Sequence, residues 1–325
     1  MNKEAYEKDL ISRVLNSVER HGGNLCLSSI ILTGSFGRGE PTYAVSSEGD
    51  VQLKSDVEIA MIFPKTSSKD AVETMITDVC AEFNEDLNLM PLNEDRVRKA
   101  YNFNYSIRVP KYKTIFTYDL FNGSKTIWGT DFIGQQQISL EEVDIYEAKR
   151  LVANRIGELI YLQETADHDQ AEYLRKQWKG KLLLAIVSAF LICEKSYVSS
   201  YHGQFAAMEK LSDSAERILG KGFINDYKGV FYFLRENEES YEVSDDRLRK
   251  YVKYIDKYFR TKKINNPRVN SSSRYIKYCI KYLKTGVKFG FLRFEDSILQ
   301  ALIHDYWSES DKVRIDAETW HQVLY

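Results

Sequence analysis

The chain has few of the residues that mark small secreted or disordered proteins. Its 325 residues include only five prolines and four cysteines, and the cysteines stand far apart with no CxxC pair. This scarcity and spacing suggest neither a disulfide framework nor a cysteine zinc site. A composition of 43% hydrophobic and 28% charged residues excludes a disordered or fibrous chain. We therefore expect a folded protein of a reducing, cytoplasmic compartment.

A long apolar run is also missing. The longest such run, LLLAIVSAFLIC at 182–193, has twelve residues, short of the roughly 20 that a bilayer-crossing helix needs. The first twenty residues are charged and amphipathic and lack the apolar core of a signal peptide. The sequence thus predicts no transmembrane segment and no export signal, and it predicts a buried core helix at 182–193.

Charge is distributed unevenly along the chain. The net charge is −2, but residues 247–293 hold fifteen Lys and Arg and one acid, a local charge of +14 that leaves −16 for the rest. Tyrosines stand among these basic residues, which is typical of single-stranded nucleic-acid binding. Apolar residues at helical spacing within 247–260 instead favour an amphipathic helix whose basic side faces solvent. We favour the solvated face and keep nucleic acid as an alternative.

The order of apolar runs and turns predicts an α+β protein. We expect an amino-terminal domain over 1–135, with a mixed β-sheet flanked by helices, and an α-helical domain over 136–325. The elements expected in the first domain are a helix at about 3–21, strands within 25–33 and at 57–63, a helix at about 68–86, and a hairpin formed by 114–121 and 125–129.

A glycine turn follows the first apolar run, and two acids open the next one. The turn reads GSFGRGE at 34–40, and the acids are Asp56 and Glu58. Glycines after a strand let the backbone approach a phosphate closely. Because alternate residues of a strand share a face, both carboxylates are expected on one side of the sheet. Paired oxygen ligands of this kind suit Mg²⁺ together with substrate phosphates.

This pattern resembles the signature of the DNA polymerase β-like nucleotidyltransferase superfamily. GSFGRGE and the later YDLFNGSKTIWG are most similar to bacterial nucleotidyltransferase-domain proteins with a helical carboxy-terminal half. The resemblance is strong over about 25–130 and weaker beyond. It implies that Mg²⁺ (or Mn²⁺) is bound by three catalytic acids, Asp56, Glu58 and Asp119, the last on a nearby strand.

The same resemblance implies nucleotide-binding residues. Gly34 and Ser35 would hold the triphosphate, and Arg38 would either contact a phosphate or pair with Glu40. A polar-to-small stripe within 177–188 makes Lys181 a further candidate, because related proteins place a lysine from this region against the triphosphate. The neighbouring Lys179 is expected on a solvated face.

The spacing departs from the usual motif, because twenty residues (36–55) separate the Gly-Ser turn from the first acid. A short β-hairpin inserted at about 41–54 would account for the extra length. Asp50 would restore the usual spacing, but its partner two residues on is Gln52, a poor metal ligand. We therefore assign the metal pair to the two acids that open the second apolar run.

The expected function is a metal-dependent nucleotidyltransferase that moves an NMP from an NTP, with ATP as the expected nucleotide, and releases pyrophosphate. The acceptor is expected to be a small molecule or a protein. One alternative is an RNA-end nucleotidyltransferase that uses the basic carboxy-terminal helices. The other is a regulatory protein that binds nucleotide without turnover.

Overall fold

The computed structural model describes residues 3–23, 25–45, 51–100, 113–165, 168–236 and 241–264. The protein has an α+β fold and divides into two compact units. The first unit runs to Val143 and also includes two short later segments, Ser199–Tyr201 and Arg235–Asn237. The second unit contains the remainder. The division after Val143 lies slightly beyond the boundary expected near residue 135.

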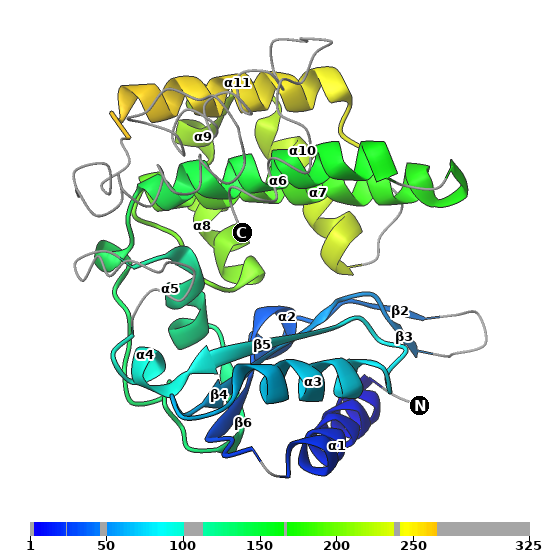
Figure 1. Cartoon of the computed structure of the whole chain (residues 1–325). Coiled ribbons are helices and arrows are strands. Elements are labelled where there is room, and N and C mark those ends of the chain that lie inside the picture. Colours follow the sequence, from blue (N-terminus) through cyan, green and yellow to red (C-terminus); the bar gives the residue numbers. More distant parts are fainter. Residues whose placement is uncertain are drawn as a thin grey trace, which may run out of the picture. The chain divides into compact units, whose positions relative to one another are not determined.

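A mixed four-stranded sheet forms the centre of the first unit (Figure 1). Its strands, in spatial order, are β5 (Leu87–Asn93), β4 (Val57–Phe63), β1 (Ser29–Leu32) and β6 (Lys125–Gly129). Strand β1 pairs antiparallel with both β4 and β6, whereas β4 and β5 are parallel. The expected mixed sheet is therefore present, but β5 was not among the expected strands.

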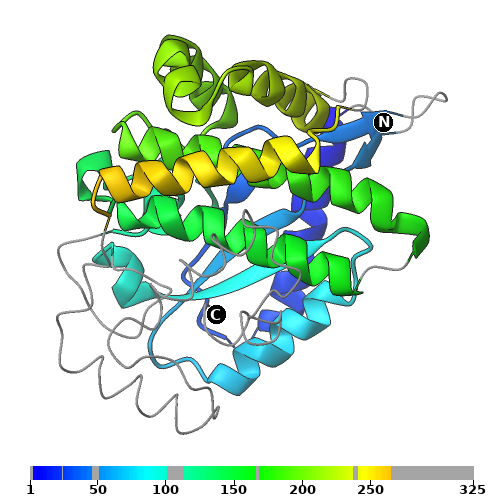
Figure 2. The ribbon, with the colours of Figure 1, turned by 90° about the horizontal axis from the view of Figure 1, so that it is seen from above.

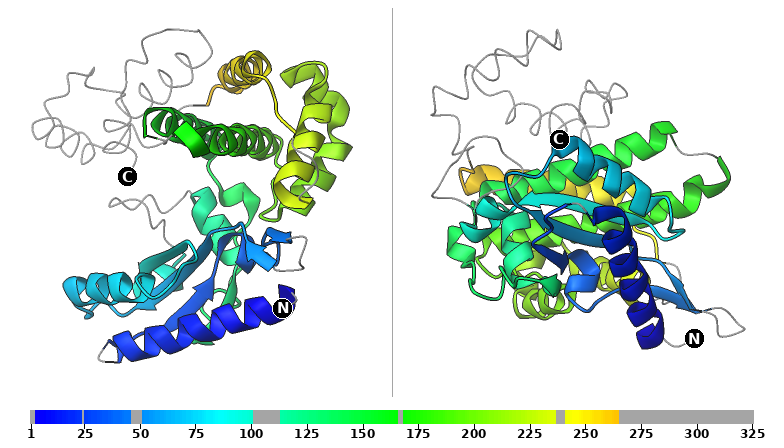
Figure 3. Two further views of the ribbon diagram at one scale, coloured as in Figure 1. Left: turned by 90° about the vertical axis from the view of Figure 1, so that its right-hand side faces the viewer. Right: turned by 60° about the horizontal axis from the view of Figure 1, so that its bottom comes forward.

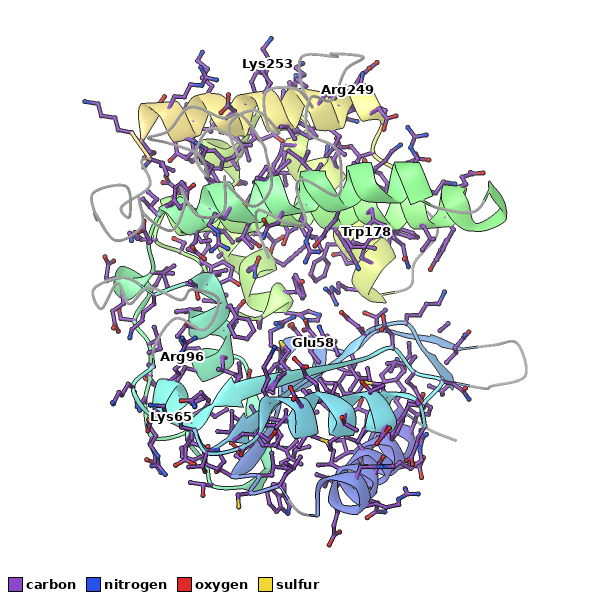
Figure 4. All side chains as sticks on the ribbon, viewed as in Figure 1. Glu58, Lys65, Arg96, Trp178, Arg249 and Lys253 are labelled. Carbon is purple, nitrogen blue, oxygen red and sulfur yellow. The ribbon has the colours of Figure 1, made fainter. Side chains whose placement is uncertain are left out.

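Helices α1 (Lys3–Gly22) and α3 (Lys69–Cys80) pack against one face of this sheet (Figure 3). Alternate residues of β4 point into the core between them, together with apolar residues of both helices: Val57, Ile59, Met61 and Phe63 meet Leu10, Val14, Val18, Val72, Met75 and Val79. Because side chains alternate along a strand, Glu58 faces the opposite side of the sheet. Figure 4 shows Glu58 on the side away from α1.

The residues between the glycine turn and β4 form an antiparallel pair, β2 (Tyr43–Val45) and β3 (Val51–Leu53). Tyr43 fastens this pair to α1, since its buried side chain donates a hydrogen bond of 2.7 Å to Glu7 and meets the ring of Tyr6 edge-on at 6.0 Å. The insertion is thus attached to the core of the unit. Asp50 lies outside the described residues.

The expected strand at 114–121 is wrong, because this segment is helix α5 (Ile115–Asn122). Thr114 begins the helix, since its hydroxyl accepts the Thr117 N–H at 3.1 Å, and the Gly123 N–H closes it on the carbonyl of Asp119 at 2.8 Å. A short apolar run fits a helix or a strand equally well, and here the cap decides. The segment 125–129 is a strand as expected, but it pairs with β1.

The described part of the second unit consists of helices (Figures 1 and 2). They are α6 (Tyr146–Thr165), α7 (His168–Cys193), α8 (Tyr201–Lys210), α9 (Ser212–Leu219), α10 (Phe223–Phe231), the π-helical turn η2 (Tyr232–Glu236) and α11 (Asp245–Thr261). Residues 182–193 are buried throughout, which confirms the predicted core helix. Within the described residues, no helix has the length and apolarity that crossing a membrane requires.

Helix α11 carries the first half of the basic segment. Ser244 caps it, and the apolar stripe predicted from the sequence is buried: Leu248, Val252, Ile255 and Phe259 are each at most 3% exposed. The basic residues of the opposite side reach solvent, as Lys253 does in Figure 4. The two-sided helix is therefore as predicted. The second half of the basic segment, with its tyrosines at 275–282, lies outside the described residues.

Candidate functional site

The glycine turn and the second acid of the predicted pair lie together. Leu32 at the end of β1 is paired with Ile59, so the turn starts beside Glu58. The Thr33 N–H donates to the Glu58 carbonyl at 2.9 Å. Gly34 has a φ of +57°, and a Cβ built there would lie 1.7 Å from Oε2 of Glu58. Only glycine fits this position, because its backbone is left-handed and the carboxylate rests directly on it.

Ser35 is buried, with 7% of its surface exposed. Its Oγ makes no hydrogen bond with any described residue. The Ser35 carbonyl accepts the Glu40 N–H at 2.8 Å, which folds the loop back on itself. Since buried hydroxyls are normally hydrogen-bonded, the Ser35 hydroxyl is a donor available to a ligand of the glycine turn.

The carboxylates of Asp56 and Glu58 stand at the start of β4. Asp56 is exposed and Glu58 is partly buried. The parallel register pairs Glu58 with Asn88 of β5, and it places Asp86, directly before β5, beside Asp56. Neighbouring strands are about 4.8 Å apart, so Asp86 is an acid near the pair that the sequence interpretation missed. Its signal was an acid before an alternating apolar stretch, the same arrangement as in β4.

Asp119 lies in helix α5, and its expected place on a strand is therefore wrong. Its carbonyl accepts hydrogen bonds from the Gly123 N–H at 2.8 Å and from the Ser124 hydroxyl at 3.3 Å. Gly37 of the glycine turn packs against this carboxy-terminal end of α5, because a Cβ at Gly37 would come within 2.8 Å of the Gly123 carbonyl. Helix α5 thus borders the glycine turn through its backbone.

Arg38 makes the intramolecular contact that was one of its two expected roles. Its Nε lies 3.5 Å from Oε2 of Glu40, and its guanidinium carbon lies 4.8 Å from the ring centroid of Tyr201. Both charged side chains are close to nine-tenths buried. Arg38 is therefore held in one orientation beside the turn.

Lys181 belongs to α7 of the second unit, where its ammonium lies 4.3 Å from the ring centroid of Trp178 (labelled in Figure 4). One small residue of the proposed stripe is engaged within this unit, since the Ser188 hydroxyl donates to Gln204 of α8 at 2.8 Å. At this end of the stripe, the space that the sequence suggested is thus taken by α8.

The expected solvated position of Lys179 is wrong. Its side chain is 6% exposed, and its ammonium lies 2.7 Å from Glu242 and 2.8 Å from Asp245. Burial raises the pKa of Asp245, but the hydrogen bond and charge of Lys179 outweigh this effect and hold the pKa below its ordinary value. Lys179 therefore stabilises the second unit.

We expect Lys179→Ala to lower the free energy of unfolding by about 2 kcal/mol, because two partly exposed carboxylates lose their buried partner. A depressed aspartate pKa stabilises the fold above the pKa of the unfolded chain, and this contribution is lost on acidification. The variant should therefore lose less stability than the wild type between pH 7 and pH 3. Urea denaturation at both pH values measures this, and equal losses would contradict the role of the pair.

In comparisons with known proteins, no family model and no curated protein matched the chain. Among the described residues, no three His, Cys, Asp or Glu side chains are grouped to hold a metal ion. Mg²⁺ is commonly held by one or two carboxylates together with substrate phosphates and waters. The carboxylates of Asp56 and Glu58, at the end of a rigid strand and beside a glycine turn, fit this mode of binding.

Proposed function

We propose that the protein is a metal-dependent nucleotidyltransferase that transfers an NMP from an NTP, with ATP as the expected donor, to a small-molecule or protein acceptor. The observation that carries the proposal is the contact between Glu58 and Gly34. It joins the two halves of a motif separated by an insertion, so that a phosphate on the glycine turn would lie beside an acidic strand end.

The proposed roles follow from the chemistry of each group. Asp56 and Glu58 would hold Mg²⁺ or Mn²⁺, which supplies charge neutralisation at the reacting phosphates. The buried Ser35 hydroxyl and the backbone of Gly34 would hydrogen-bond phosphate oxygens. Asp86, at the register position beside Asp56, replaces Asp119 as our candidate for the third acid. Asp86 would accept the proton of the acceptor hydroxyl. The oxygen of that hydroxyl would form a bond to the α-phosphorus, and pyrophosphate would leave.

The direct test is incubation of the full chain with each α-labelled NTP and Mg²⁺ or Mn²⁺. Transfer of label to the protein or to an added acceptor, with stoichiometric pyrophosphate, is the expected result. A nucleotide-dependent rise in melting temperature without pyrophosphate release, over a broad set of acceptors, would instead favour a non-catalytic nucleotide-binding protein.

Lys181 enters the proposal as a triphosphate ligand. We expect Lys181→Ala to reduce the rise in melting temperature caused by Mg·ATP, because the proposed positive charge on the triphosphate is removed. Lys210→Ala, which removes an exposed lysine of α8, is the matched control and should leave the shift unchanged. Differential scanning fluorimetry over a series of ATP concentrations measures both, and equal behaviour of the two variants would remove Lys181 from the site.

A further inference from the structure

A second charged cluster in the first unit involves residues far apart in sequence. Tyr201 begins α8, yet its N–H donates to Oε2 of Glu40 at 2.9 Å, next to the glycine turn. The guanidinium carbon of Arg38 lies 4.8 Å from the Tyr201 ring centroid, and that of Arg235 lies 3.7 Å from it. One aromatic ring thus holds two arginines.

The two guanidinium groups are close neighbours. Their distances to one centroid mean that at most 8.5 Å separates their central carbons. Like charges at this distance repel each other, and a ring quadrupole offsets only part of the cost. Glu40 belongs to this cluster, because its Oε2 is shared between Arg38 and the Tyr201 N–H.

Arg235 has an unused donor. Its Nε is buried and forms no hydrogen bond with a described residue. A buried donor without an acceptor costs about 1–3 kcal/mol. The residue lies in the π-helical turn η2. Such turns are rare in proteins overall but occur often at functional sites. The planar fork of N–H donors of a guanidinium group matches the oxygens of a phosphate group.

We propose that Arg38 and Arg235, held on Tyr201, form a phosphate-binding site next to the glycine turn. The phosphate would bridge the two guanidinium groups and accept a hydrogen bond from the Nε of Arg235. Phosphate binding at this site does not depend on the proposed function. Only the assignment of the phosphate to the nucleotide or to the acceptor rests on that function. Arg235 is thus a phosphate-binding residue that no local motif marks.

The test is titration calorimetry of the metal-free full chain with inorganic pyrophosphate, which requires no turnover. Arg235→Gln should weaken binding by about tenfold or more, since charge-assisted hydrogen bonds are lost. Arg98→Gln is the matched control. Arg98 belongs to the same unit, lies 4.6 Å from the Phe132 ring centroid and pairs with Glu94, but it is not part of the cluster. Its loss should leave pyrophosphate affinity unchanged.

Arg235→Lys separates binding from mere stability, because it keeps the charge without the planar fork. If both Arg235 variants melt within a few degrees of the wild type and Arg235→Gln binds pyrophosphate as tightly as Arg98→Gln does, the proposal is overturned. Competition between pyrophosphate and ATP would assign the site to the donor nucleotide, and simultaneous binding would assign it to a phosphorylated acceptor. If the wild type transfers no nucleotide and Arg235→Gln still loses pyrophosphate affinity, the proposed function is contradicted but the phosphate-binding site is supported.

Discussion

Asp56→Asn and Glu58→Gln are each expected to reduce nucleotidyl transfer by at least about a thousandfold, with the fold intact. Each removes one metal-binding carboxylate at constant side-chain volume, and the loss of about 4 kcal/mol of transition-state stabilisation corresponds to that factor. Stability without metal should be unchanged or higher, because a repulsion between two acids is relieved. Pyrophosphate release and thermal melting measure the two effects.

Glu73→Gln on α3 is the control for this pair, because its carboxylate makes only an exposed ion pair with Lys69. It should keep wild-type turnover. Asp86→Asn and Asp119→Asn extend the series, and we expect the first to reduce transfer much more than the second. Transfer at the wild-type rate by Asp56→Asn or Glu58→Gln would contradict the assignment of these two acids as metal ligands. A greater loss of transfer activity in Asp119→Asn than in Asp86→Asn would identify Asp119 of α5 as the third acid.

Gly34→Ala is expected to abolish transfer and to weaken nucleotide binding strongly. The new methyl group would overlap the Glu58 carboxylate and force it away from the turn. Gly39→Ala provides a matched control, since Gly39 also has a positive φ, +70°, but has no atom within 4 Å of a Cβ. Both variants should lose about 1–2 kcal/mol of stability from the left-handed backbone.

Only Gly34→Ala should lose activity beyond what this destabilisation explains. Turnover and the Mg·ATP-induced melting shift, measured at a temperature where both variants are folded, separate the two effects. Equal loss in both variants would mean that the contact between Gly34 and Glu58 has no part in the function.

Much of the first unit could be predicted from its sequence, because β4 and the helices beside it carry regular patterns. The residues VEIAMIF alternate around Glu58, and their bounds are those of the strand. Two elements could not be predicted in this way. The apolar run of helix α5 is too short for its periodicity to distinguish a helix from a strand. In β5, Asn88 and Pro91 interrupt the apolar pattern that would indicate a strand. The pairing of β6 with β1 depends on which partners remain once α5 is helical.

Some residues of the candidate site could also be identified from the sequence, whereas others could not. Gly34, Ser35 and Glu58 belong to the motif read from the sequence, and the structure places Gly34 directly against the Glu58 carboxylate. Lys179 was misplaced because its carboxylate partners, Glu242 and Asp245, follow more than sixty residues later. Tyr201 and Arg235 have no local pattern that would connect them with the glycine turn, so contacts at this separation need coordinates.

The first unit consists of three segments that lie far apart in the sequence, and this affects how it can fold during synthesis. Strand β1 at Ser29–Leu32 completes its pairing only when β6 has been synthesised, and Tyr201 and Arg235 of the same unit emerge far later. Domains usually fold during synthesis in order from the amino terminus, and distant pairings form slowly. Here the ribosome must synthesise all of α6 to α10 before the residues at 235–237 can join the first unit. A nascent chain arrested before Arg235 would therefore hold an incomplete first unit, with the Tyr201 ring still lacking its second arginine.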